Sequence, residues 1–251
     1  MTLFRGRCTS VAGAGRFTVK AKALDLIDRD PALACQVLAP LLLPERRERI
    51  ELAIGQRLGG LRVAIENLHD PHNGAAVLRS AEAFGVQRVD VIESVEPFRF
   101  STVVSQGCEK WLDIVRHKTH QAAVAALRAD GFVIYAAVPG AAVTVDDLDF
   151  GRRAAILVGN EHEGLSQSAI DDAEVRFSIP MPGMTRSLNL SVAAALVTER
   201  AAARRRAALG QPGDLDQATQ LKLRARFYAA SVRGAEAVLA RYGSAGRPPL
   251  S

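Results

Sequence analysis

Five short, mainly apolar runs recur between residues 61 and 179, and they constrain the fold more than any other feature of the chain. Runs of this length, separated by helical patterns, are typical of strands that are covered on both faces of a parallel sheet. The strand candidates are Leu61–Ile65, Arg88–Ile92, Phe132–Ala137, Ala154–Val158 and Val175–Ile179. The helix candidates are Ala75–Phe84, Gln121–Ala129, Ser166–Ala173 and Leu188–Ala208. We therefore expect an α/β fold whose mostly parallel sheet is flanked by helices.

Helical additions are expected at both ends of this domain. Before it, the helical pieces are Ala21–Asp28, Ala32–Leu41 and Glu45–Leu58, and Gly59-Gly60 should end the last of them. After it come a linker at Gly210–Gly213, a basic helical segment at Gln217–Arg241 and an expected disordered tail at Gly243–Ser251. The sequence thus predicts an N-terminal extension over residues 1–58, a main domain over 59–208 and a C-terminal extension over 209–251.

The net charge of +5 is unevenly distributed along the chain. Residues 1–22 carry five basic side chains and no acidic one, residues 200–251 have a net charge of +7, and the rest carries −7. An acidic body with basic ends is typical of a protein that binds a polyanion through its extensions. The alternative for Arg200–Arg206 is a solvated helix end, where the dipole favours positive charge. That alternative explains only one of the two ends.

Membrane and secreted classes are disfavoured. No apolar stretch is long enough to span a bilayer, and no apolar segment follows the charged residues Met1–Arg7 as it would in a signal peptide. We therefore expect a cytoplasmic protein without a membrane partner. Cys8, Cys35 and Cys108 are widely spaced and form no C-x-x-C pair, so we expect free, mostly buried thiols.

Two histidine pairs have a spacing that could suit a metal, His69 with His72 and His117 with His120. Neither pair has a third ligand or a glutamate in the register of a zinc-binding helix. No metal site is expected.

The first segment that could carry chemistry runs from the first strand into a helix, over Asn67–Arg79. Asn73 is a good N-cap, and Gly74–Ala76 leave the first turn unobstructed. A helix N-terminus with exposed amides and a nearby arginine can bind an anion. The alternative is an ordinary capped helix with a surface arginine.

The second segment, Gly159–Gly164, holds four polar residues directly after an apolar strand, and Ser166 follows as a candidate N-cap. Polar groups at the end of a buried strand are costly unless they bind something. A solvated loop is the alternative.

The third segment, Ile179–Asn189, contains two prolines and a glycine, which predict a stiff loop. Ser187 is expected to cap the next helix, whose first turns have small side chains that let backbone or ligand approach closely. Tight packing of helix on sheet is the alternative, and it leaves Asn189 in the first turn unexplained.

Together and in this order, the three segments resemble the signature motifs of the SpoU (TrmH-like) branch of the SPOUT methyltransferases. The resemblance covers roughly Leu61–Arg200, through N-x-x-x-x-x-R, L-V-G-N-E-x-x-G-L-S and I-P-M-x-G-x-x-x-S-L-N-x-S-V-A. It implies a trefoil knot at the C-terminal part of the α/β domain, which is a rare exception among folds. It also implies S-adenosylmethionine as methyl donor, and a homodimer whose site uses both subunits.

The resemblance also assigns site residues, position by position. It implies a catalytic role for Arg79, Asn73, Glu161, Ser187 and Asn189. It implies that the methyl donor rests mainly on backbone at Ala136, Gly159, Ile179, Met181 and Leu188. The family's pattern often has a polar residue where Ala136 stands, so only a backbone contact is expected there.

Within the family the closest likeness is to the tRNA enzymes that methylate the 2′-hydroxyl of guanosine 18 in the D-loop. Glu66–Asn73 resembles their approach to the first motif, and Trp111 with Lys118-Thr119 resembles their mid-domain segment. The implied partner is tRNA and not DNA, because the 2′-hydroxyl is the reacting group. Met1–Leu43 is longer than the N-terminus of the minimal tRNA enzymes, which leaves the choice of RNA open.

Two other functions remain open at this point. One is 2′-O-methylation of ribosomal RNA or of another tRNA position. The other is a non-catalytic RNA-binding or assembly factor on the same fold, although the retention of Asn73, Arg79, Glu161 and Asn189 speaks against it. A guanidinium hardly deprotonates in proteins, so we expect Arg79 to bind phosphate and orient the hydroxyl rather than act as a base.

Overall fold

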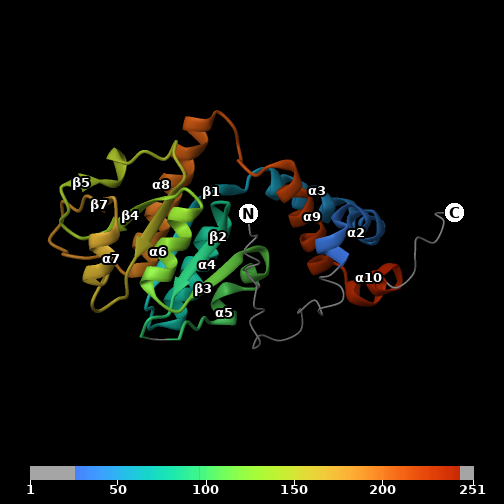
Figure 1. Cartoon of the computed structure of the whole chain (residues 1–251), viewed down its shortest axis with the longest axis horizontal. Coiled ribbons are helices and arrows are strands. Elements are labelled where there is room, and N and C mark those ends of the chain that lie inside the picture. Colours follow the sequence, from blue (N-terminus) through green and yellow to red (C-terminus); the bar gives the residue numbers. More distant parts are fainter. Residues whose placement is uncertain (1–25, 96, 244–251) are drawn as a thin grey trace. The chain divides into compact units, whose positions relative to one another are not determined.

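The computed structural model describes residues 26–95 and 97–243, which form two compact units (Figure 1). Residues 56–215 form an α/β unit, and the described parts of residues 1–55 and 216–251 together form a helical unit. The expectations for residues 1–22, for Cys8, for most of Ala21–Asp28 and for the tail after residue 243 lie outside the described residues.

The α/β unit is built on one seven-stranded sheet in the order β3-β2-β1-β6-β4-β7-β5, in which every neighbouring pair is parallel. The strands are β1 (Leu58–Glu66), β2 (Val86–Ile92), β3 (Asp113–His117), β4 (Val133–Ala137), β5 (Val143–Thr144), β6 (Ala154–Val158) and β7 (Val175–Ser178). The expected parallel α/β sheet is confirmed, and it contains all five strand candidates. Strands β3 and β5 were not expected.

Helices cover both faces of this sheet (Figure 1). They are α4 (Pro71–Ala83), α5 (Thr102–Ser105), α6 (His120–Ala129), α7 (Gln167–Asp172) and α8 (Leu190–Leu209), with 3-10 turns η2 (Cys108–Trp111) and η3 (Val145–Asp147). Val63 and Ile65 of β1 belong to the core beneath α4 and α8, whereas Ala64 belongs to the core beneath α6 and α7. This two-sided burial explains the continuous apolar run. Among the described residues, no helix is both long enough and apolar enough to cross a bilayer.

The glycine pair Gly59-Gly60 was expected to end a helix, and this expectation is wrong, because both glycines lie in β1. A Cβ atom on Gly60 would lie 1.9 Å from Nη2 of Arg205. The carboxylate of Asp214 accepts hydrogen bonds from both glycine amides and from Nε of Arg205. The glycines are therefore needed for close packing of distant residues against the strand, and not as a helix stop.

The helical unit contains segments from both ends of the described chain. Its elements are α2 (Pro31–Leu38), η1 (Ala39–Leu41), α3 (Pro44–Gly55), α9 (Gln217–Ser231) and α10 (Ala235–Gly243), and α9 packs against α2 and α3. Helix α3 thus ends before the expected Leu58. The segment expected to be helical over Gln217–Arg241 is broken before α10, where Gly234 has a φ of +74°.

A polar cluster joins α3 to α9 inside the helical unit. Glu51 accepts hydrogen bonds from Nε of Arg224 at 2.8 Å and from the hydroxyl of Tyr228 at 2.7 Å. Burial alone would raise the pKa of Glu51, but the hydrogen bonds from Arg224 and Tyr228 hold that pKa below its usual value. Burial and the bond to Glu51 raise the pKa of Tyr228. The two chain segments are therefore held together by an ionic contact at neutral pH.

Cys35 and Cys108 are buried free thiols, as expected. Burial raises the pKa of Cys35 to about 11 and that of Cys108 to about 12. Both thiols are therefore protonated at neutral pH, which makes them poor nucleophiles.

We predict that Asp214→Ala lowers the free energy of unfolding by about 3 kcal/mol, because it leaves the buried guanidinium of Arg205 without its carboxylate. Asp146→Ala is the matched control, since it breaks an ion pair with Arg200 in which both side chains are about half exposed. That loss should be at most about 1 kcal/mol. Urea unfolding followed by circular dichroism measures both, and equal losses would contradict the argument.

Candidate active site

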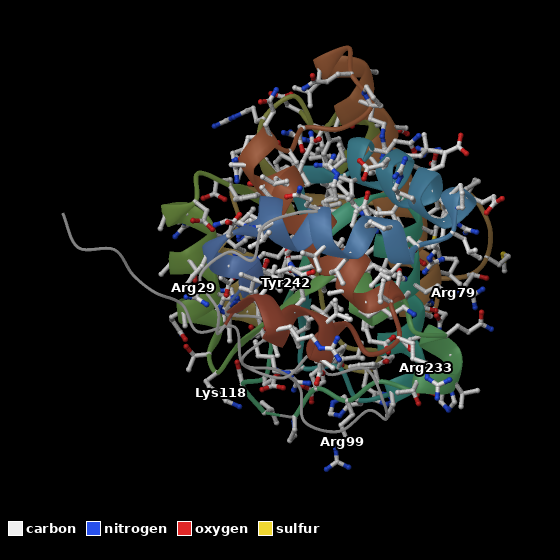
Figure 2. The ribbon with its side chains drawn as sticks, turned by 90° about the vertical axis from the view of Figure 1, so that its right-hand side faces the viewer. Arg29, Arg79, Arg99, Lys118, Arg233 and Tyr242 are labelled. Carbon is white, nitrogen blue, oxygen red and sulfur yellow. The ribbon has the colours of Figure 1, made fainter. Side chains whose placement is uncertain are left out.

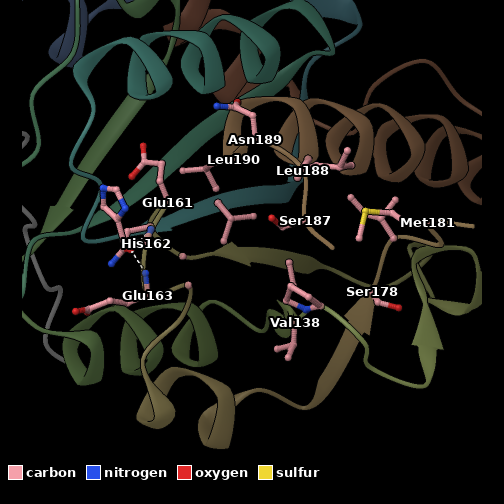
Figure 3. Close-up of a pocket in the computed structure, with 18 of the residues that line it drawn as sticks. Val138, Glu161, His162, Glu163, Ser178, Met181, Ser187, Leu188, Asn189 and Leu190 are labelled. Atoms are coloured by element: carbon pink, nitrogen blue, oxygen red, sulfur yellow. Dashed lines mark hydrogen bonds between the residues drawn. The ribbon is translucent and has the colours of Figure 1, made fainter. Parts of the chain in front are cut away.

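Loops that follow β4, β6 and β7, together with the start of α8, enclose a cavity of about 580 Å³ (Figure 3). Ligands of open α/β sheets bind outside the carboxyl ends of the strands, where the strand order reverses. The cavity lies outside the carboxyl ends of β6, β4 and β7, which are neighbours in the sheet. Its volume is in the range typical of small-molecule sites, roughly 300–1,000 Å³. The described residues that line it are 137–139, 158–164, 177–179, 181, 187–190 and 193.

The loop over residues 159–164 is a tight turn that closes on itself. Asn160 and Gly164 exchange two backbone hydrogen bonds of 3.0 and 3.2 Å, and the side-chain oxygen of Asn160 accepts from the amides of His162 and Glu163. A Cβ atom on Gly159 would lie 2.0 Å from the carbonyl carbon of Gly164, which itself has a φ of +72°. Both positions therefore require glycine, and the backbone of a compact turn forms one wall of the cavity.

Asn189, and not Ser187, caps helix α8. The side-chain oxygen of Asn189 accepts hydrogen bonds from the amides of Ser191 at 2.9 Å and Val192 at 3.4 Å. The expectation for Ser187 as cap is wrong, and Ser187 is instead an exposed residue that lines the cavity (Figure 3). Capping uses only the oxygen of Asn189, so its amide nitrogen is available to another partner.

Helix α4 is capped by Asp70, and the expectation that Asn73 caps it is wrong. The carboxylate of Asp70 accepts from the amide of His72 at 2.8 Å, and Pro71 takes the first helical position. Proline suits that position because its φ is already helical and its missing N–H needs no partner there. Asn73 is therefore a buried residue of the first turn whose side chain is not used for capping.

One line of hydrogen bonds links all three sequence motifs. The amide nitrogen of Asn189 donates to the side-chain oxygen of Asn73 at 3.2 Å, and the nitrogen of Asn73 donates to Glu161 at 2.7 Å. A carboxylate can only accept, which fixes the orientation of the Asn73 amide between its two neighbours. The second oxygen of Glu161 is buried and has no hydrogen-bond partner among the described residues. This unpartnered oxygen belongs to a residue that lines the cavity.

The cavity gathers most of the predicted site residues. Its lining includes Glu161, Ser187 and Asn189, and also the predicted cofactor positions Gly159, Ile179, Met181 and Leu188.

Three predicted residues are not among the described residues that line the cavity. Asn73 contacts it through Glu161, and Ala136 is fully buried in β4, one residue before the lining begins at Ala137. Arg79 is exposed on α4 (Figure 2), and its charge acts on the thiol of Cys108 at η2. The cavity and Arg79 of one chain thus do not form a single continuous site.

The sequence reasoning missed the segment after β4, where Val138 (Figure 3) and Pro139 line the cavity. The signal was present, because β4 was predicted as a strand and parallel strands in one sheet end at the same edge. Among the described residues, no group of three His, Cys, Asp or Glu side chains is placed to hold a metal ion. His69 and His162 instead contact each other, with ring centroids 5.8 Å apart.

We predict that Asn73→Asp destabilises the protein by about 2 kcal/mol at pH 7, because a carboxylate would replace the donor that now faces Glu161. Two adjacent carboxylates raise a pKa in the folded state above its unfolded value. The deficit relative to the wild type should therefore grow as pH rises from about 4 to 7 and shrink as pH falls. Thermal unfolding across this range measures it. Asn73→Ala adds no charge and should show a loss that does not change with pH; the same flat profile for Asn73→Asp would refute the argument.

Comparison with known proteins agrees with this geometry. The SpoU rRNA Methylase family matches residues 60–199 of the chain. A tRNA (guanosine(18)-2'-O)-methyltransferase from Escherichia coli K12 is 35% identical over 184 residues, which are 72% of this chain and 80% of that protein.

Two solved structures are similar. The A. aeolicus TrmH/SpoU tRNA modifying enzyme is 25% identical, with a TM-score of 0.66, over 73% of this chain and 95% of that one. The SpoU methyltransferase AviRb from Streptomyces viridochromogenes, solved with AdoMet, is 28% identical, with a TM-score of 0.54, over 61% of this chain and 62% of that one. The family match covers more than half of the chain and includes all three motifs. The chain belongs to the SpoU methylase family.

Proposed function

We propose that the protein methylates the ribose 2′-hydroxyl of guanosine 18 in the D-loop of tRNA, with S-adenosylmethionine as methyl donor. The observation that carries the proposal is the line of hydrogen bonds through Asn189, Asn73 and Glu161, which joins the three family motifs beside one cavity. The choice of tRNA and of position 18 is supported by the name of the 35% identical E. coli relative. We propose that the protein acts in the cytoplasm, because its proposed substrate tRNA is present there.

The residues around the cavity suit the proposed donor. S-adenosylmethionine supplies, when bound, a methyl group on a positively charged sulfur. A cavity of about 580 Å³ with a glycine-built main-chain wall offers room and backbone groups to a nucleoside. The unpartnered oxygen of Glu161 suits a ligand that carries positive charge or hydrogen-bond donors. AviRb, which shares the fold, was solved with AdoMet.

Methyl transfer to a hydroxyl requires alignment of the attacking oxygen and loss of its proton. Most of the rate gain can come from alignment alone. We assign Arg79 to the phosphate next to the target nucleotide, where its planar guanidinium binds two oxygens and orients the ribose. The proton then passes to phosphate or solvent, since a guanidinium does not accept it. Asn73 positions α4, which carries Arg79, relative to the turn at Glu161.

We further propose that the chain acts as a homodimer in which Arg79 of one subunit serves the cavity of the other. The proposal is supported by the exposed position of Arg79, outside the lining of its own cavity. It is also supported by two exposed apolar side chains one turn apart on α8, Val192 and Leu196, each with 47% exposure. Neighbouring exposed apolar side chains of this kind suit an interaction surface.

The trefoil knot belongs to the same proposal. We place it in the C-terminal part of the α/β unit, between β6 and α8, where the second and third motifs lie. The support is the family membership and the position of β6 between β1 and β4, which requires the chain to return into the middle of the sheet. We assign catalysis to residues 59–208 and RNA binding to the basic extensions 1–58 and 209–251.

We predict that the protein incorporates one methyl group into an unmodified tRNA transcript and none into a copy with 2′-O-methylguanosine at position 18. Transfer of label from S-adenosylmethionine measures both reactions. Equal incorporation into the two transcripts would point to another tRNA position, and incorporation into ribosomal RNA fragments alone would point to the rRNA alternative. A protein that binds RNA but transfers no methyl group would be the non-catalytic factor.

We predict that Arg79→Lys lowers kcat at least about tenfold, because lysine keeps the charge but cannot bind phosphate through two parallel hydrogen bonds. The affinity for S-adenosylmethionine should stay within about twofold of the wild type, because Arg79 is assigned to the RNA phosphate and not to the methyl donor. Arg152→Lys is the control, an exposed arginine outside the cavity lining. Near-normal turnover by Arg79→Lys would show that charge alone is enough.

A further inference from the structure

Glu66, the last residue of β1, is a buried acid that the reaction as described does not use. Its exposed fraction is 2%. Ile65 of β1 pairs with Val158 of β6, so Glu66 ends β1 at the level where Gly159 begins the turn beside the cavity. A buried carboxyl group is costly unless its oxygens are hydrogen-bonded, so its partners indicate what it holds.

Both oxygens of Glu66 accept hydrogen bonds from a single residue, Ser166. The backbone amide of Ser166 donates to Oε2 at 2.8 Å, and its hydroxyl donates to Oε1 at 2.8 Å. The same hydroxyl accepts from the amide of Ala169 at 3.2 Å and so caps α7. Glu66 therefore fixes the backbone position of Ser166 and the rotamer of its capping hydroxyl.

A second side chain, that of His120, lies near the same oxygen of Glu66 that accepts from the Ser166 hydroxyl. Nδ1 of the buried His120 is 3.9 Å from Oε1 of Glu66, and Nε2 of His120 is 2.9 Å from Oδ2 of Asp172. His120 begins α6, and Asp172 ends α7. Glu66 thus lies where β1, α6 and α7 meet.

Holding Ser166 also holds the turn at residues 159–164. The two ends of that turn contact each other so closely that a Cβ atom on Gly159 would lie 2.2 Å from the amide nitrogen of Leu165. Two backbone hydrogen bonds between Asn160 and Gly164 close the turn. Since Leu165, with 8% exposure, connects the turn directly to Ser166, a shift at Ser166 moves the cavity wall with it.

We propose that Glu66 is a positioning residue for the methyl donor, which sets the cavity wall at Gly159–Gly164 through its two hydrogen bonds to Ser166. This inference rests on the proposed function. Glu66 does not touch the reacting atoms; Asn73 holds the middle of the turn through Glu161, and Glu66 holds its end.

The test compares Glu66→Gln with the wild type in three measurements. Glutamine keeps the shape but presents a donor where one oxygen of Glu66 now accepts from Ser166. The Kd for S-adenosylmethionine by calorimetry should rise about tenfold, whereas kcat at saturating donor should change less than about twofold. In the free protein, amide hydrogen exchange of a peptide that covers residues 159–166 should accelerate about tenfold.

Ser166→Ala removes the hydroxyl that donates to Glu66 and caps α7, and Ser166 lies at the surface. This variant therefore tests the same contact if Glu66→Gln does not fold. It should raise the Kd about threefold. The Kd of the double variant for S-adenosylmethionine should be no higher than that of Glu66→Gln alone, because both changes reach the cavity wall through the contact between Glu66 and Ser166. The lost cap of α7 should appear as a lower Tm.

Glu93→Gln is the matched control. Glu93 follows the neighbouring strand β2, is also buried, and accepts from the amide of Phe98 at 3.0 Å, in a loop that does not line the cavity. It should lower the Tm but leave the Kd for the donor within about twofold of the wild type.

An unchanged Kd and unchanged exchange in Glu66→Gln would overturn the inference, as would an equal rise in Kd for Glu93→Gln. If the wild type bound no S-adenosylmethionine, the proposed function would fail instead. Exchange in the free protein would then still decide whether Glu66 holds the turn.

Discussion

Strand β6 pairs with β1 although β2, β3, β4 and β5 come between them in the chain. Parallel pairing in register, with Ile65 opposite Val158, brings the end of β1 to the same level as the end of β6. The segment that follows β1 and the turn that follows β6 must then lie side by side, whatever their side chains are. The contacts of Glu66 with Ser166, and of Asn73 with Glu161, are possible only because of this pairing. The pairing in turn depends on burial of both faces of the two strands, which their apolar residues make favourable.

The hydrogen bonds that join the loops at the edge of the sheet use asparagines that could otherwise cap their own helices. An asparagine near a helix start commonly caps that helix through its own oxygen. Because Asp70 already caps α4, both ends of the Asn73 amide are used between loops, one toward Asn189 and one toward Glu161. Asn189 does both, since its oxygen caps α8 and its nitrogen reaches Asn73. Fixed amide orientations of this kind make the relative position of the loops specific, since a shift of either loop would leave a buried polar group without a partner.

The sheet was predictable because burial on two faces leaves a pattern in the sequence, and the caps were less so because several residues could fill the same local role. Ser187 and Asn189 are both acceptable N-caps, and the bond from Asn189 to a distant residue is not visible in local sequence. Strand β3 was missed because it is only partly buried and carries Asp113 and Arg116, so it lacks a continuous apolar run. Gly59-Gly60 was misread because the residues that need the space, Arg205 and Asp214, come much later in the chain. The motifs predicted most of the residues that line the cavity. Why the motifs lie together is explained only by the order of the strands in the sheet.

Because Arg79 is separate from the cavity, binding of the methyl donor and positioning of the RNA depend on different parts of the chain. The second and third motifs lie within one α/β unit and form a cavity whose walls are set by glycine turns and by hydrogen bonds inside the chain. Arg79 points to solvent from α4, and the line of bonds from Asn73 through Glu161 is what connects that helix to the cavity of its own chain. A change at the cavity wall should therefore affect the affinity for the methyl donor more than the affinity for RNA. A change on the outer surface of α4 should affect the affinity for RNA more than the affinity for the methyl donor. Because the motifs lie mainly on the donor side of this division, their strong match identifies the chemistry far better than it identifies the RNA.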